Sequence, residues 1–249
     1  MNFKEITLDV KTPFITSFLY LIYSIRQNRR LQNVQPLKRE LFSFLTVLMV
    51  VHNIILCIFS LVTFINTFPV IYKSLMYKPL FYFINDPKKE MLYRLEYWIW
   101  IFYVSKIYEV VDSIILHVNK RQTSFLQMYH HAGAIICCWM LCRANTHLAW
   151  IFVVLNSFIH TIMYFYYMLT TLRFKPKFKR IITRMQIGQF VIGILLLFVH
   201  TSSHHQWSKD KNTRQFQFWT FGLNIFYVAT LFLLFRRFEK KTYTKHKKQ

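Results

Sequence analysis

The chain is divided into apolar runs of about 20 residues, each bounded by basic residues. A helix of that length matches the thickness of the hydrocarbon core of a bilayer. The runs predict spans at residues 12–25, 42–66, 97–116, 125–142, 147–171, 185–203 and 216–236, with an irregular or partly interfacial segment at 67–95. We therefore expect an all-α integral membrane protein with seven transmembrane helices.

The composition supports this class and argues against a nucleic-acid partner. With 54% hydrophobic and 19% aromatic residues, the chain is too apolar for an ordinary soluble domain. A net charge of +22 would indicate nucleic-acid binding if the basic residues formed one patch, but they lie between the apolar runs, where they set membrane topology. The cysteines lie inside the runs and are expected to pack as small apolar side chains.

The distribution of Lys and Arg predicts the orientation of the spans. The connections 26–41, 117–124, 172–184 and 236–249 hold 20 of these residues, whereas the segments on the other side hold 11. Because basic connections stay in the cytosol, we expect a cytosolic C-terminus and a lumenal N-terminus. Residues 241–249 then form a basic cytosolic tail, in which Lys245 and Lys247 have the spacing of a dilysine retrieval signal for the endoplasmic reticulum.

Polar side chains inside four of the spans gather at one depth. Their spacing of three or four residues places each set on one face of a helix, and the predicted orientation places all four sets in the cytosolic half. The sets are Lys106, Glu109, Asp112 and Ser113; Gln127, His130 and His131; Asn156, His160, Met163, Tyr164 and Tyr167; and Thr183, Gln186 and Gln189. Any one set has a structural explanation, but four at one depth predict a site, since ionisable groups inside membranes mark chemistry or transport.

The residue types indicate proton abstraction or acyl transfer. Glu109 and Asp112 are the only acids in the expected spans, and Lys106 lies one turn from Glu109, so the carboxylates can stay ionised. A carboxylate that accepts one imidazole N–H makes the other ring nitrogen a better base or nucleophile. No metal site is predicted.

In order and spacing, the four motifs resemble the signatures of the ELO family of fatty-acid elongases. They read Lys106-x-x-Glu109-x-x-Asp112-Ser113, Gln127-x-x-His130-His131, Asn156-x-x-x-His160-x-x-Met163-Tyr164-x-Tyr166-Tyr167 and Thr183-x-x-Gln186-x-x-Gln189. The similarity covers about residues 12–240, and His52-Asn53 also resembles the family pattern. Residues 1–240 are accordingly expected to form a single seven-helix domain.

The resemblance implies a 3-oxoacyl-CoA synthase of the endoplasmic reticulum membrane. Such an enzyme condenses acyl-CoA with malonyl-CoA, releases carbon dioxide and CoA, and uses CoA thioesters as substrates without a further cofactor. Six of the seven helices are expected to enclose a tunnel that is open to the cytosol and closed at its lumenal end. The implied partners are a ketoacyl reductase, a dehydratase, an enoyl reductase and a second copy in a homodimer.

The resemblance also implies residue roles. His130 is expected to attack the thioester and form an acyl-imidazole, with His160 assisting, and His131 and Asp112 are expected to orient groups and transfer protons. The same motifs place Glu109 and Gln127 in the catalytic set. Lys106 and basic residues of 172–184 are expected to meet CoA phosphates. The expected substrate-binding residues are Asn156, Met163, Tyr164, Tyr166, Tyr167, Thr183, Gln186 and Gln189.

The chain departs from the family pattern at two positions. The family often has His at the position of Gln127 and Thr at that of Ser113. The serine keeps the hydroxyl. Gln127 removes a titratable group. A glutamine at this position resembles the pattern of elongases that act on polyunsaturated acyl chains.

Two other functions fit parts of the sequence. His200-x-x-x-His204-His205 resembles a histidine box of membrane di-iron desaturases and hydroxylases, but the predicted orientation places it roughly 25 Å or more from His130. A seven-helix receptor or transporter shares the predicted orientation, yet its polar groups would lie near the midplane or open to the outer side.

Overall fold

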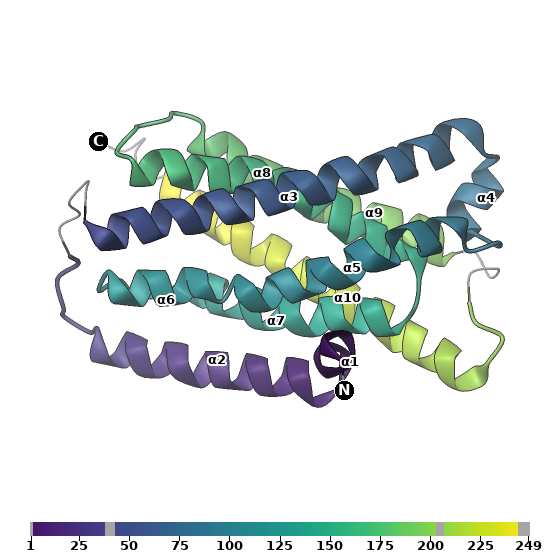
Figure 1. The fold of residues 1–249 in the computed structure, drawn as a ribbon, viewed down its shortest axis with the longest axis horizontal. Coiled ribbons are helices and arrows are strands. Elements are labelled where there is room, and N and C mark those ends of the chain that lie inside the picture. The colour runs from purple at the N-terminus through teal and green to yellow at the C-terminus, as the bar shows by residue number, and fades with distance from the viewer. Residues whose placement is uncertain (1, 38–42, 203–206, 244–249) are drawn as a thin grey trace.

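The computed structural model describes residues 2–37, 43–202 and 207–243, in which every regular element is a helix (Figure 1). The elements are α1 (Phe3–Leu8), α2 (Lys11–Arg30), α3 (Phe44–Tyr77), α4 (Leu80–Asn85), α5 (Glu90–Tyr108), α6 (Val111–Val118), α7 (Phe125–Arg143), the 3-10 turn η1 (His147–Ala149), α8 (Trp150–Thr171), α9 (Lys179–Thr201) and α10 (Lys211–Tyr243).

Six of these helices close a ring. Helix α3 packs along α8, α8 against α9, α9 against α10, α10 against α7, α7 against α5, and α5 against α3. Helix α2 lies outside this ring, where it packs on α7 and α6, and Figure 1 shows it along the edge of the molecule. Six helices therefore surround a common interior, and α2 supports them from outside.

Within the described residues, five segments are long and apolar enough to cross a membrane: α3, α7, the segment His147–Thr171, α9 and α10. The chain is therefore a multi-pass membrane protein. The other two expected spans correspond to α2 and to α5 with α6, whose helices do not contain a comparably long apolar stretch.

The expected irregular segment at 67–95 is wrong for most of its length. Helix α3 continues through Pro69 to Tyr77, although a proline inside a helix removes one backbone hydrogen bond. The helix persists because its later turns are packed: Ile71 is buried in one core cluster with Phe83 and Leu95. Burial of apolar surface at this site outweighs the local cost of the proline.

The connection from α3 to α5 is held by polar contacts. The carboxylate of Asp86 accepts hydrogen bonds from the backbone N–H groups of Met91 and Leu92 at 3.1 and 2.9 Å, which satisfies the start of α5. Lys78 Nζ lies 2.5 Å from Glu90 Oε2, and this hydrogen bond holds the pKa of Glu90 below its usual value. These contacts join the ends of α3 and α5.

The third expected span, 97–116, is not one helix. Helix α5 ends at Tyr108 and α6 begins at Val111, with Glu109 and Val110 in a tightened turn. The backbone N–H of Asp112 bonds the carbonyl oxygen of Glu109 at 3.1 Å, and the N–H of Ser113 bonds that of Val110 at 3.0 Å. These bonds reach back three residues instead of four, so the side chains on either side of the turn are rotated relative to those of a straight helix.

Two buried histidines fix the end of the ring that carries α4. His147 Nε2 and His200 Nδ1 lie 3.1 and 3.0 Å from the same acceptor, the carbonyl oxygen of Ile84. Phe83 and Trp150 pack their rings against His200. His200 is thus a structural contact of α4. The other two residues of its expected histidine box, His204 and His205, lie outside the described residues, as do Lys245 and Lys247.

Exposed tyrosines gather around the same end. We call them the tyrosine belt; they come from the last turns of α3, from α4 and from the first turns of α5. The members are Tyr72, Tyr77, Tyr82, Tyr93 and Tyr97. Tyrosine is enriched where a membrane meets water, because its ring is apolar and its hydroxyl is polar.

Candidate functional site

The motif residues meet in two groups inside the ring. We name each group after its carboxylate. The Glu109 cluster contains Lys106, Glu109, His130, Asn156 and His160. The Asp112 cluster contains His52, Tyr108, Asp112, His131 and Tyr164. Residues from α3, α5, α6, α7 and α8 therefore lie together, among them Tyr108, which belongs to none of the four motifs.

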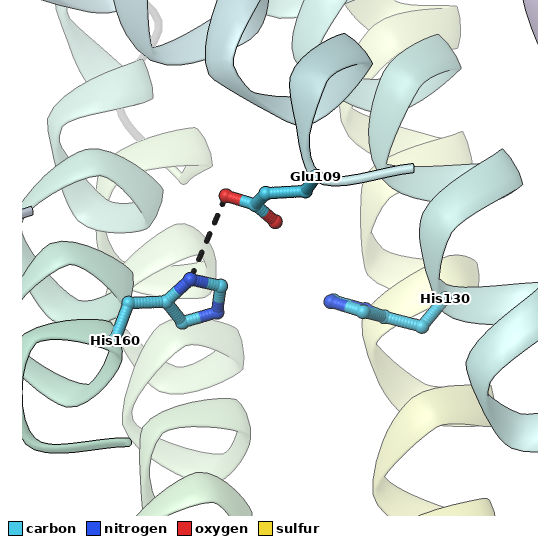
Figure 2. Close-up of side chains that lie close together, drawn as sticks. All are labelled: Glu109, His130 and His160. Carbon is cyan, nitrogen blue, oxygen red and sulfur yellow. Dashed lines mark ion pairs between the residues drawn. The ribbon is translucent and has the colours of Figure 1, made fainter. Parts of the chain in front are cut away.

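The Glu109 cluster is a buried ion pair that faces two imidazoles. Lys106 Nζ donates to Glu109 Oε1 at 2.6 Å and to Asn156 Oδ1 at 2.8 Å. His160 Nδ1 lies 3.6 Å from Glu109 Oε1, and Figure 2 shows His160 and His130 on opposite sides of a gap next to this carboxylate. Glu109 Oε2 and His160 Nδ1 are buried without a hydrogen-bond partner.

The position of Lys106 corrects one expectation. Its side chain is only 4% exposed, its ammonium lies between Glu109 and Asn156, and it stands 4.1 Å from the centre of the Phe102 ring. An ammonium in this position balances the charge of Glu109 inside the protein. It is not available to CoA phosphates in water.

The Asp112 cluster is more completely paired. His52 Nε2 donates to Asp112 Oδ1 at 2.8 Å, and the Tyr164 hydroxyl donates to Oδ2 at 2.8 Å. His52 Nδ1 lies 3.2 Å from the hydroxyl oxygen of Tyr108. His131 Nε2 is 4.0 Å from Oδ2, which is beyond hydrogen-bond distance. Asp112 therefore orients His52 and Tyr164 more directly than His131.

The side chain of Gln127 bonds to a residue outside the Glu109 cluster. Its side-chain amide donates to Ser113 Oγ at 3.2 Å, and Ser113 Oγ lies 2.9 Å from the hydroxyl of Tyr20 on α2. The Ser124 side chain caps α7 by accepting from the backbone N–H of Gln127. Gln127 was expected in the catalytic set, but in the structure it joins α7 to α6 and, through Ser113, to α2.

The expected substrate-binding residues divide by position. Asn156 and Gln189 line the central cavity described below, and Gln189 Oε1 is buried without a partner. The others lie towards the end of the ring where α8 ends and α9 begins. There Gln186 donates to Met163 Sδ at 3.3 Å, and Thr183 donates to the Lys179 carbonyl oxygen at 3.2 Å. Tyr166 packs on Phe178, Tyr164 packs on Tyr167, and the side chain of Tyr167 is exposed.

A narrow cavity of about 70 Å³ leads from the Glu109 cluster into the ring. It is lined from α5, α7, α8, α9 and α10, and apart from a few polar groups its walls are apolar. The lining includes Phe102, His130, Phe152, Phe190 and Tyr227. A space of this size holds a few water molecules or a short stretch of methylene groups.

Glu109, His130 and His160 also form a donor set that could hold a cation. One ligand atom from each lies within 4.8 Å of the other two, and imidazole and carboxylate are common zinc ligands. However, the Lys106 ammonium already neutralises Glu109 at 2.6 Å, and a divalent cation beside it would meet a like charge. The donor set therefore fits a proton or an acyl group better than a metal.

Two residues at the site lie outside the expected site residues. His52 belongs only to the additional pattern His52-Asn53, and Tyr227 belongs to no motif. The Tyr227 hydroxyl lies 2.7 Å from the backbone oxygen of His130 and 3.2 Å from its Nδ1. A usable signal was present, because Asn224 and Tyr227 are three residues apart on one face of the last apolar run, and both line the cavity.

Comparisons with known proteins agree with the motifs. The model of the GNS1/SUR4 family, ELO, matches residues 6–249. Fatty acid elongase A of Dictyostelium discoideum is 29% identical over 244 residues, which cover 95% of this chain and 84% of that protein. Fatty acid elongase sre1 of the same organism is 31% identical over 187 residues, or 74% of this chain and 68% of its own length. Very long chain fatty acid elongase 6 of Drosophila melanogaster is 31% identical over 206 residues, which cover 78% of this chain and 62% of that protein. No solved structure matches the chain.

Proposed function

The chain belongs to the ELO family, also described as the GNS1/SUR4 family, and on that premise we propose that it is a fatty-acid elongase. Its reaction is the condensation of an acyl-CoA with malonyl-CoA, which gives a 3-oxoacyl-CoA, carbon dioxide and CoA. The relatives with the printed name fatty acid elongase support this class of reaction.

One observation supports the chemistry most directly. Glu109 Oε2 is buried without a hydrogen-bond partner and points into the gap that a ring nitrogen of His130 also faces (Figure 2), whereas His160 Nδ1 lies 3.6 Å from Glu109 Oε1. A buried polar atom without a hydrogen bond costs free energy. Such an atom beside the gap, at the mouth of an apolar cavity, fits a ligand that supplies a polar group and an acyl chain.

In the first step, a ring nitrogen of His130 attacks the carbonyl carbon of the acyl thioester. The new C–N bond forms, the C–S bond breaks, and CoA leaves as a thiolate that takes a proton from water. The acyl group is then carried on the imidazole. His160, on the other side of the gap, holds the substrate carbonyl in line, and Glu109, 3.6 Å from His160 Nδ1, orients that ring.

In the second step, malonyl-CoA loses its carboxylate as carbon dioxide. The carbanion that remains attacks the acyl carbon, the C–N bond breaks, and the electron pair returns to His130. The Asp112 cluster supports this step by fixing the position of Tyr164, whose ring packs at 5.4 Å from that of His160. No cofactor beyond the two CoA thioesters takes part.

The charge pattern and the family support the setting that we propose. The enzyme lies in the endoplasmic reticulum membrane with its N-terminus in the lumen and its C-terminus in the cytosol. Seven helices cross the bilayer, and six of them enclose a tunnel that opens to the cytosol. Basic residues of 172–184 meet the CoA phosphates in place of the buried Lys106. A ketoacyl reductase, a dehydratase and an enoyl reductase complete the cycle, and the enzyme acts as a homodimer.

The test is condensation by purified protein in detergent. Labelled malonyl-CoA is supplied with saturated and polyunsaturated acyl-CoAs, and 3-oxoacyl-CoA is measured for the wild type and for His130→Ala. Product from the wild type and none from a folded variant supports the proposal, whereas no product from a monodisperse wild type refutes it. Faster turnover of polyunsaturated acyl-CoAs would support the preference for polyunsaturated chains that is inferred from Gln127. Equal or faster turnover of saturated acyl-CoAs would remove that support.

A further inference from the structure

The hydroxyl of Tyr227 touches His130 at two points. It lies 2.7 Å from the backbone oxygen of His130 and 3.2 Å from Nδ1 of the same residue. Tyr227 belongs to α10, lines the cavity, and has a side chain that is only 8% exposed. No motif of the four signatures contains it.

These two distances decide which nitrogen of His130 carries the proton. Two oxygens at 2.7 Å repel one another unless a hydrogen lies between them, so the single hydroxyl hydrogen of Tyr227 is donated to the backbone oxygen. The hydroxyl oxygen can then only accept from Nδ1. His130 therefore carries its proton on Nδ1 and leaves Nε2 as an unprotonated lone pair.

Nε2 is also the nitrogen that reaches the gap. Figure 2 shows the ring nitrogen at the far end of the His130 side chain pointing between Glu109 and His160. Nδ1, which adjoins the attachment point of the ring, is the nitrogen near Tyr227. The hydrogen bond thus directs the lone pair to the place where substrate is expected.

Gly133 makes room for this contact. It lies one turn after His130 on α7, and a Cβ added there would stand 2.3 Å from Cε2 and 2.8 Å from Cδ2 of Tyr227. Separations this short are not tolerated, and the ring is held in a core cluster with Phe190 and Leu231. The absence of a side chain at 133 is what allows the ring of Tyr227 to lie against α7.

We propose that Tyr227, seated on Gly133, is a positioning residue that fixes the Nδ1-protonated tautomer of His130 and so presents Nε2 to the thioester. This inference rests on the proposed function. When Nε2 attacks, the C–N bond forms, the C–S bond breaks, the thiolate leaves and the ring becomes positively charged while Nδ1 keeps its proton. The hydrogen bond from Nδ1 to Tyr227 strengthens as that charge develops, so it stabilises the transition state more than the bound substrate.

The first test is Tyr227→Phe, which removes the hydroxyl and keeps the ring. The readout is CoA release from acyl-CoA without malonyl-CoA, together with kcat and KM for condensation. We expect kcat and CoA release to fall about tenfold to hundredfold while KM for acyl-CoA stays within about twofold. The matched control is Tyr129→Phe, because it also removes one tyrosine hydroxyl, and that hydroxyl bonds Thr230 instead of the His130 ring while the Tyr129 ring packs on Tyr227. Equal rates for the two variants would overturn the proposal.

The second test approaches the same contact from α7. Gly133→Ala should displace the ring of Tyr227 and lower kcat in the same way. Its control is Gly222→Ala, since a Cβ there meets no atom within 4 Å. If Gly133→Ala is folded and as active as Gly222→Ala, the packing of the Tyr227 ring against Gly133 has no role in positioning His130.

The third test needs no Tyr227 variant and no activity. Nitrogen NMR of wild-type protein with 15N-labelled histidine distinguishes the two tautomers, and the His130 signals are identified by their loss in His130→Ala. We expect the proton on Nδ1, although free histidine prefers it on Nε2. A proton on Nε2 would refute the inference even if condensation is observed. If the wild type did not condense the two thioesters, the proposed function would be refuted. The NMR result would still show whether Tyr227 fixes the tautomer of His130.

Discussion

Glu109 and Asp112 are three residues apart, yet their carboxylates lie in opposite chemical situations. The Glu109 side chain is 3% exposed, with one oxygen bound to Lys106 and the other without a hydrogen-bond partner. The Asp112 side chain is 20% exposed, and both of its oxygens accept hydrogen bonds. The turn between α5 and α6 separates them. On a straight helix they would share a face.

The difference distinguishes a reacting group from a supporting one. Every contact of Asp112 fixes another side chain in place, which is what a scaffold requires. The Glu109 cluster retains unpaired atoms at a free-energy cost, and a protein keeps such a cost where a ligand removes it. The following predictions test this contrast, beginning with the largest expected effect.

The sharpest test compares one histidine from each cluster. His160→Ala should lower condensation about a thousandfold, because it removes a group that faces the gap. His52→Ala should lower it by about tenfold or less, because His52 touches Asp112 and Tyr108 but not the gap. Both variants are assayed by 3-oxoacyl-CoA formation after thermal unfolding has shown that they are folded. Equal losses in the two variants would abolish the distinction between the clusters.

The second prediction concerns the stability that the buried ion pair of Lys106 and Glu109 provides. Glu109→Gln leaves the Lys106 ammonium without its carboxylate, and we expect a loss of about 3–5 kcal/mol in unfolding free energy. The double variant Lys106→Met, Glu109→Leu removes both charges and should recover most of that loss while remaining inactive. The midpoint of thermal unfolding in detergent measures both. A double variant as unstable as the single one would show that the charge is not the cause.

A smaller effect is expected for Tyr164→Phe. This change removes one hydrogen bond to Asp112 and leaves the bond from His52, so stability should fall by about 2 kcal/mol. Tyr72→Phe is the control, because Tyr72 is exposed. A shift in the unfolding midpoint no larger than that of the control would mean that the Tyr164 contact does not support Asp112.

The smallest expected effect is that of metal removal. Lys106 already balances Glu109, so dialysis against a chelator should leave condensation unchanged. Loss of activity that added zinc restores would contradict this expectation and assign Glu109, His130 and His160 to a metal.

The sequence predicted the layer of polar residues because helical periodicity is local. The positions of Lys106, His130 and His160 at one depth follow from where each span begins. The sequence did not predict the turn after Glu109, because no proline or glycine marks that turn. It also did not predict that α3 continues through Pro69, because this continuation depends on the packing of Ile71 against residues far away in the chain. Tyr227 was missed because its role depends on a contact between residues 97 positions apart.

The tyrosine belt has a consequence for how the protein sits in a bilayer. His52 precedes Tyr72 by 20 residues on α3, which is about 30 Å of helix and matches the thickness of the hydrocarbon core. If the belt lies in one headgroup layer, the two clusters lie close to the other. An acyl chain can then enter the apolar interior from that boundary while the charged nucleotide end of its carrier stays in water.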